Sequence, residues 1–162
     1  MYYHVQTHKD IPEEEARHFR HTVHQTLNDP RGWGIPFYDL PLEHLLQMPK
    51  EKAFIIRLTP KEVLNQKYAE FAERQLSVAN MSQRIIDINW CRWTEACPNH
   101  SQLPLDQYRL YVIQHEVGHM MGKPHPTSLP EQAKAPVMIQ QTLGIHQYQP
   151  NPWPTEFDKN VL

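Results

Sequence analysis

The chain has few cysteines and few glycines, and each shortage limits the kinds of structure it can form. Only two of its 162 residues are cysteines, and Cys91 and Cys97 lack the C-x-x-C spacing of a redox or metal-binding knuckle. A local disulfide and a pair of free thiols are both consistent with this spacing. Five glycines stand against fifteen prolines, which favours a loop-rich chain with stiff, extended connections.

Long apolar runs and concentrated charge are also absent. No stretch has the roughly 20 apolar residues that cross a bilayer, so we expect no membrane span. A formal net charge of −2, with no lysine- or arginine-rich run, argues against nucleic acid as a partner. The first ten residues have neither the basic nor the apolar region of a signal peptide. The compartment stays open, including secretion or surface anchoring of a chain that has been trimmed, and so does the oligomeric state.

The residues that are present suit one globular domain. Apolar residues make up 40% of the chain, enough for a single core. Apolar residues recur at helical spacing after Pro12, at Ala16, Phe19, Val23 and Leu27. Together with β-branched runs, the pattern predicts strands over residues 2–7, 53–60 and 84–93. It predicts helices over 12–29, 61–77 and 105–122, with Asp106 as the N-cap of the third helix.

The segment YVIQHEVGHMMGKPH, residues 111–125, carries the strongest chemical signal. His115 and His119 are four residues apart, so on a helix they project from one face and can meet at one metal ion. Glu116 is rotated by roughly 100° from His115, which suits a base beside the metal better than a ligand. This is the H-E-x-x-H pattern of zinc proteases.

A catalytic zinc site needs a third protein ligand and a fourth position for water. Gly122 can adopt positive φ, end the helix and return the chain so that His125 reaches the metal. Gly118 is costly inside a helix, which suggests that another backbone packs close to it. A closed structural zinc site is the main alternative, but no fourth ligand has suitable spacing.

The longer pattern H-E-x-x-H-x-x-G-x-x-H, followed by a methionine turn, is the metzincin signature. The sequence matches it at His115, Glu116, His119, Gly122 and His125. The resemblance implies that Met138, in APVMIQQT, forms an apolar floor beneath the metal. Taken alone, Met138 would be an ordinary core residue.

A wider resemblance covers nearly the whole chain. HEVGHMMG, APVMIQQT and NPWP, with TLNDPRGWG nearer the front, resemble the DUF3152 family, a metzincin-like group of zinc peptidases. Members of that family usually carry a cysteine after the third histidine and another before the PNPWP block. This chain has neither, so the resemblance implies no C-terminal disulfide here.

The expected fold is therefore α+β and zincin-like, of metzincin type. It would contain a twisted mixed sheet, a backing helix, an active-site helix and a small irregular C-terminal portion. We expect one catalytic domain over residues 1–162, with an N-terminal portion of about 1–122, a C-terminal portion of about 123–162 and a cleft between them.

The expected function is that of a zinc metalloendopeptidase acting on a peptide or protein substrate. His115, His119 and His125 would bind Zn²⁺, and Glu116 would activate a zinc-bound water. The strand RIIDINW, residues 84–90, is the candidate edge for an extended substrate. Two alternatives are a zinc-binding interaction module without turnover and a zinc amidase acting on a cell-wall amide.

Three further histidines, His18, His21 and His24, fall at positions i, i+3 and i+6 of the first predicted helix. A second metal site there is conceivable. The neighbouring Arg17 and Arg20 favour a solvated polar face instead.

Overall fold

The computed structural model describes residues 1–71, 76–95 and 102–160, which form a mixed α+β fold. Its five-stranded sheet has the order β2-β1-β3-β5-β4, with parallel pairing throughout except for the antiparallel β4. The mixed sheet is as predicted. The strands are β1 (Tyr2–Thr7), β2 (Tyr38–Asp39), β3 (Ala53–Thr59), β4 (Val78–Asn80) and β5 (Ile85–Asn89).

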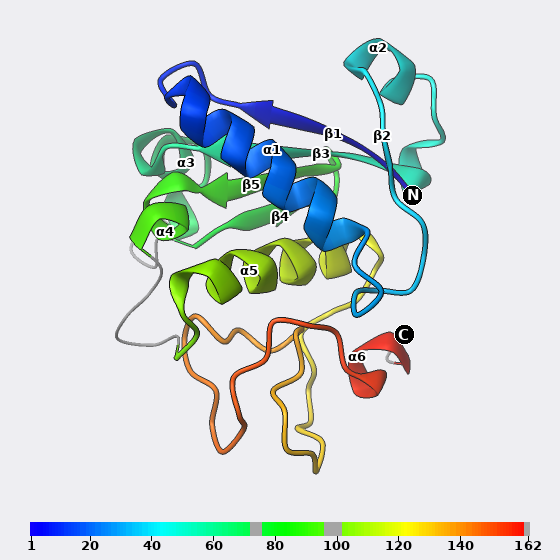
Figure 1. Ribbon diagram of the computed structural model, residues 1–162, viewed down its shortest axis with the longest axis vertical. Helices are drawn as coiled ribbons and strands as arrows, with labels where there is room; N and C mark the ends of the chain where they lie inside the picture. The colour runs from blue at the N-terminus through cyan, green and yellow to red at the C-terminus, as the bar shows by residue number, and fades with distance from the viewer. Residues whose placement is uncertain (72–75, 96–101, 161–162) are drawn as a thin grey trace.

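Six α-helices accompany the sheet in the described residues. Two of them are long: α1 lies across the sheet, and α5 runs beside it, below it in the view of Figure 1. The helices are α1 (Glu13–Leu27), α2 (Leu42–Leu45), α3 (Lys61–Lys67), α4 (Trp90–Glu95), α5 (Leu105–Met120) and α6 (Glu156–Asn160), with 3-10 turns at Lys50–Lys52 and Ala69–Phe71.

The main core lies between the sheet and these two long helices. Alternate residues of the central strands point to one face, because side chains of a strand alternate with a period of two. Phe54 and Ile56 of β3 and Ile88 of β5 are among them, each no more than 1% exposed. The predicted apolar stripe of α1 is buried against them, which confirms that helix.

The opposite face of the sheet holds a buried ionic cluster around Asp87. Arg57 donates two hydrogen bonds to its carboxylate, at 2.6 and 3.0 Å. Lys67, Tyr68 and Thr59 donate three more, at 3.1, 2.9 and 2.9 Å. A buried carboxylate with this many donors is compensated for its lost hydration, so the cluster fastens α3 and its following turn to β3 and β5.

The predicted strand over 84–93 is wrong in its second half. β5 ends at Asn89, whose side-chain oxygen accepts hydrogen bonds from the N–H groups of Cys91 and Arg92. Such an asparagine caps a helix N-terminus, so the chain turns directly from β5 into α4. Asp106 is likewise not the cap of α5, because that helix begins at Leu105 after Pro104.

The predicted substrate edge is also misplaced. β5 lies between β3 and β4, so its backbone is paired on both sides. The edge strand next to it is the short β4. The continuous burial of Ile86–Asn89 is typical of an interior strand rather than an edge.

Two other predictions have mixed outcomes. The helix expected over 61–77 is present only as α3 and the following 3-10 turn, while residues 72–75 lie outside the described ones. The disulfide question stays open, because Cys91 has no disulfide partner among the described residues and Cys97 lies outside them.

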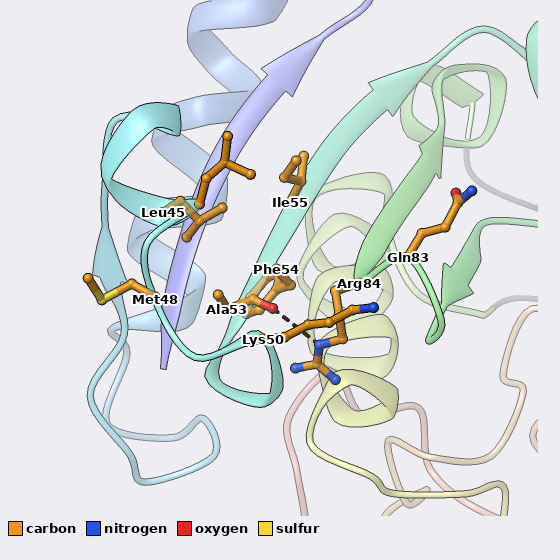
Figure 2. Close-up of a pocket in the computed structure, with 9 residues that line it drawn as sticks. Leu45, Met48, Lys50, Ala53, Phe54, Ile55, Gln83 and Arg84 are labelled. Atoms are coloured by element: carbon orange, nitrogen blue, oxygen red, sulfur yellow. Dashed lines mark hydrogen bonds between the residues drawn. The ribbon is translucent and has the colours of Figure 1, made fainter.

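Arg84 links the start of the central strands to the end of α5. Its guanidinium donates to the carbonyls of Ala53 (3.1 Å), Glu51 (3.1 Å) and Met120 (2.8 Å), and Figure 2 shows the first of these. Arg84 itself has φ 58°. A cation at the last carbonyls of a helix is favourable, so this contact stabilises the C-terminal end of α5.

The segment after α5 is largely irregular, as predicted. An isolated bridge joins Lys134 to Gln149, and α6 is the one helix among its described residues. Across the described ranges, no helix has both the length and the hydropathy of a membrane span.

Candidate metal centre

The end of α5 turns the chain back toward its own last two turns. Gly122 has φ 83°, the N–H of Lys123 donates to the carbonyl of Gly118 (2.9 Å), and that of Gly122 donates to the carbonyl of His119 (2.9 Å). These two bonds define a Schellman motif, which requires a residue in the left-handed region. The chain beyond it carries His125 back to the face of α5 that holds His115 and His119.

The three histidines meet through the same ring atom. The Nε2 atom of His125 lies 3.1 Å from that of His115 and 3.1 Å from that of His119. Two nitrogens bound to one tetrahedral zinc ion are about 3.3 Å apart, given Zn–N bonds of about 2.0–2.1 Å. The spacing therefore fits a shared zinc ion.

Backbone carbonyls fix the tautomers of the two helix histidines. His115 Nδ1 lies 2.7 Å from the carbonyl of Val137, and His119 Nδ1 lies 2.9 Å from that of Lys123. A carbonyl only accepts, so each Nδ1 carries the proton and each Nε2 presents a lone pair. Lone pairs directed at one point, each backed by a carbonyl, are the arrangement found around bound metals.

All three rings favour the neutral form that binds metal. Burial, and then the neighbouring His119, lower the pKa of His115 well below its usual value. Burial also lowers the pKa of His119, and burial together with His119 lowers the pKa of His125 to about 4. These shifts favour uncharged rings near pH 7, the form that a metal ion binds.

The cluster borders solvent on one side. His115 is buried, His119 is half-buried and His125 is exposed. Among the described residues, no fourth histidine, cysteine, aspartate or glutamate joins the group. Three nitrogen donors with one open position suit a catalytic zinc site better than a closed structural one.

Glu116 lies on the wall of the cavity that the histidines face. This cavity, of about 240 Å³, is lined by all three histidines, Glu116 and residues 76–79, which lead into and include part of β4. Burial raises the pKa of the Glu116 carboxyl to about 8. A carboxyl whose pKa lies near neutrality can both accept and return a proton.

Met138 packs beneath α5 at Gly118. A Cβ at Gly118 would lie 2.4 Å from Met138 Sδ and 2.7 Å from Trp33 Cζ2. The close neighbours of Gly118 are thus side chains, and the expectation of a packed backbone is wrong. Glycine is needed here because the methionine and the tryptophan fill the space a side chain would occupy.

Residues 2–158 match the family described as "Protein of unknown function (DUF3152)". The chain belongs to the DUF3152 family. No curated protein and no solved structure matches it. The match confirms the resemblance seen in the sequence, while the description attaches no activity to DUF3152.

In this DUF3152 chain, two residues near the cluster were not predicted from the sequence. The Tyr111 hydroxyl donates to the carbonyl of Ile139 (3.0 Å) and accepts from the N–H of Gln141 (2.9 Å), which holds the chain after Met138. Asp158 accepts from the N–H groups of Val137 and Met138, at 2.9 and 3.0 Å. Thr155 and Asp158, in TEFD, have the spacing of a capping box, a signal that could have singled out Asp158.

The histidines of α1 do not form a second centre in the described part of this DUF3152 chain. His24 pairs with the Tyr3 hydroxyl (3.0 Å), and His18 lies edge-on to Trp93. Among the described residues, the cluster of His115, His119 and His125 is the one group of three or more side chains placed to share a metal ion.

A separate cavity of about 300 Å³ lies beside α2 and β3, lined by residues such as Leu45, Met48 and Phe54 (Figure 2). It contains none of the motif residues. In this DUF3152 chain the three histidines and Glu116 therefore line a different cavity from this one.

Proposed function

We propose that this protein is a zinc-dependent metallopeptidase. The observation that carries the proposal is the convergence of three Nε2 atoms, from His115, His119 and His125, beside the buried carboxyl of Glu116. The ligand set, the open position and the adjoining base together match metal-assisted hydrolysis.

In this proposal His115, His119 and His125 hold the zinc ion, and the carbonyls of Val137 and Lys123 keep the first two rings oriented. Bound zinc would supply a Lewis acid for water and for the scissile carbonyl. Neutral imidazoles would not offset the charge of the ion, which would favour that role.

Glu116 moves the proton. Its carboxylate accepts a proton from the attacking water and delivers it to the nitrogen of the departing amine. No hydrogen bond or ion pair within the described residues ties the carboxylate elsewhere, so it is free to serve both steps. A bound cation would lower its pKa from about 8 toward the ionised form that accepts the first proton.

The substrate would be an extended peptide. β4 ends the sheet, and Val78 and Ala79 line the same cavity as Glu116 and the histidines. Main-chain groups on the outer side of an edge strand can pair with an added peptide, which would lie across the metal.

A second cavity, of about 540 Å³, adjoins the first through His125 and Gln140. Its wall mixes apolar residues, such as Leu129 and Leu143, with polar ones, such as Gln140 and His146. We expect it to take a large side chain of the substrate next to the bond that is cut.

Metal analysis is the first test. The purified wild-type protein should contain one equivalent of zinc after equilibration and dialysis, and His119→Ala should lose it. His21→Ala is the matched control, since His21 is exposed on α1 and should leave the zinc content unchanged. A wild-type protein that binds no zinc would refute the proposal.

Cleavage of a peptide library is the second test. Glu116→Gln should retain zinc and lower kcat by about 10²–10⁴-fold, the usual contribution of a general base. Glu14→Gln, on the exposed face of α1, should cleave like wild type. Zinc binding with no peptide cleavage would argue against the peptidase. Tight capture of a partner would then favour the interaction module, and hydrolysis of cell-wall fragments would favour the amidase.

A further inference from the structure

α6 is a five-residue helix 31 residues beyond His125 in the chain, yet it lies below the C-terminal end of α5 (Figure 1). Its Asp158 is 1% exposed. A buried carboxylate must be fully hydrogen-bonded to be tolerated, so its partners show what it holds in place.

The partners of Asp158 are backbone groups on two segments, together with one hydroxyl. One oxygen accepts from Val137 N–H (2.9 Å), Thr155 N–H (2.7 Å) and the Thr155 hydroxyl (2.8 Å), and the other accepts from Met138 N–H (3.0 Å). Asp158 thus closes the start of its own helix and fixes the peptide groups on both sides of Val137. The carbonyl of Val137 is the group that accepts from His115 Nδ1.

A second contact from α6 reaches the other helix histidine. The Lys123 ammonium donates to the carbonyl of Lys159 (2.8 Å). Lys123 follows the Schellman turn, and its own carbonyl accepts from His119 Nδ1. Two neighbouring residues of α6 therefore reach the two segments whose carbonyls orient His115 and His119.

We propose that α6 sets the orientation and tautomer of both helix histidines, with Asp158 as the positioning residue. Asp158 touches neither the histidine rings nor the Glu116 carboxyl, so it acts through the Val137 peptide. The proposal rests on the three-histidine centre described above, and it holds whether or not the centre cleaves peptides.

The decisive comparison is Asp158→Asn against Glu156→Gln. Both replace a carboxylate on α6 by its amide, but Glu156 has a side chain that is 85% exposed. The side chain of Asp158→Asn would turn its NH2 group toward at least one backbone N–H that now donates to Asp158. Two donors cannot form a hydrogen bond with each other, so we expect the Val137 peptide and its carbonyl to shift. Loss of such support typically lowers metal affinity by about 10–100-fold, so we expect that loss in Asp158→Asn and none in Glu156→Gln.

Two measurements follow the effect. Competition with a chromogenic chelator gives the zinc Kd. Long-range ¹H–¹⁵N spectra of the metal-free protein give the tautomer of His115, which should be Nδ1–H in wild type and mixed in Asp158→Asn. Circular dichroism verifies that each variant is folded. In a folded variant, a general loss of stability would change neither the zinc Kd nor the His115 tautomer.

The inference is overturned if folded Asp158→Asn keeps both the zinc Kd and the His115 tautomer of Glu156→Gln. If Asp158→Asn does not fold, Lys123→Met decides, because it removes the ammonium bond to α6 and keeps a side chain of similar length. An unchanged zinc Kd and His119 tautomer in that variant would overturn the inference, and a weaker Kd with a mixed tautomer would support it. Peptide cleavage is not a readout here, so a failed peptidase proposal would not be mistaken for a failed positioning role.

Discussion

The sheet region, here residues 1–71, 76–95 and 102–122, and the C-terminal segment, here residues 123–160, are stabilised in different ways. Strand ladders and helices satisfy most of the backbone in the sheet region, and large apolar side chains fill its core. In the C-terminal segment, the backbone bonds are those of isolated turns and one bridge, and buried side chains satisfy further backbone groups. Asn151 donates to the carbonyl of Ala135 (2.9 Å), and Gln141 donates to the carbonyl of Asn151 (2.7 Å).

The difference shows where each region is sensitive to change. A ladder distributes its stability over many equivalent bonds, whereas a buried side-chain amide satisfies groups that nothing else can reach. The candidate metal centre lies where the two regions meet. Two histidines come from the last turns of α5, and the third histidine and both orienting carbonyls come from the C-terminal segment.

The largest loss of unfolding free energy should come from a substitution in the sheet region that leaves zinc binding unchanged. Asp87→Ala leaves Arg57 and Lys67 beside an empty site, and loss of one partner of a buried ion pair costs about 3–5 kcal/mol. Urea unfolding should show this loss, while the zinc Kd of the folded protein stays the same. Asp10→Ala, at an exposed site, should change stability by less than about 0.5 kcal/mol. A changed zinc Kd would show that the two regions are coupled.

Asp87 should also make the unfolding free energy depend on pH. Burial alone would raise the pKa of Asp87, but the hydrogen bonds from Arg57, Thr59 and the nearby Lys67 outweigh it and hold the pKa below its usual value. This stabilisation is present above the unfolded pKa of about 3.9 and is lost as the pH falls through the folded pKa. Below about pH 4 the unfolding free energy of wild type should fall, and that of Asp87→Ala should fall less steeply.

Metal removal should act on the C-terminal segment. At zinc concentrations 100 times the Kd, binding stabilises the folded state by about 2.7 kcal/mol, so a chelator should lower the Tm of wild type but not of His119→Ala. Hydrogen exchange should place the lost protection after Gly122 and around His115, with little change in β1 and β3. Equal loss in all strands would contradict the division drawn here.

A smaller effect is expected at the contact between the regions. Gly118→Ala gains up to about 1 kcal/mol of helix propensity but forces a methyl group against Met138 and the rigid ring of Trp33. Overpacking typically costs about 1–3 kcal/mol, so we expect a net loss of stability. Thermal unfolding of the metal-free protein measures it, with Gln107→Ala on the exposed face of α5 as the control. A stabilised Gly118→Ala would show that the side chains of Met138 and Trp33 move aside at little cost.

The smallest effect should lie within the C-terminal segment. Tyr148→Phe removes the hydroxyl that donates to the carbonyl of Pro130 (2.7 Å), a bond worth about 0.5–1.5 kcal/mol. Tyr38→Phe, at a 52% exposed residue, should be neutral. Equal unfolding free energies for the two variants would mean that water replaces the lost bond.

The length of an element decided how well the sequence predicted it. The 3.6-residue period of α1 and the β-branched run of β3 were sufficient, because burial on one face imposes a regular pattern. β4 and α6 have three and five residues, too few for a period to appear, and the side of β5 on which β4 pairs depends on contacts far away in the sequence.

The candidate centre divides in the same way. The spacing of His115, His119, Gly122 and His125 is local, so helix geometry and one left-handed turn were enough to predict that the rings approach each other. The support from Val137, Lys123 and Asp158 depends on where an irregular chain returns, which no local pattern encodes. The motif therefore indicated the candidate ligands, and the structure was needed to find the groups that orient their rings.

The parallel pairing of β1 with β3 has a kinetic consequence. Tyr2 pairs with Ala53, so the chain must close a loop of about fifty residues before this ladder forms, and such distant contacts slow folding. The three histidines are at most ten residues apart and make no such demand. Refolding should therefore proceed at nearly the same rate with or without zinc, while unfolding slows when the ion is bound.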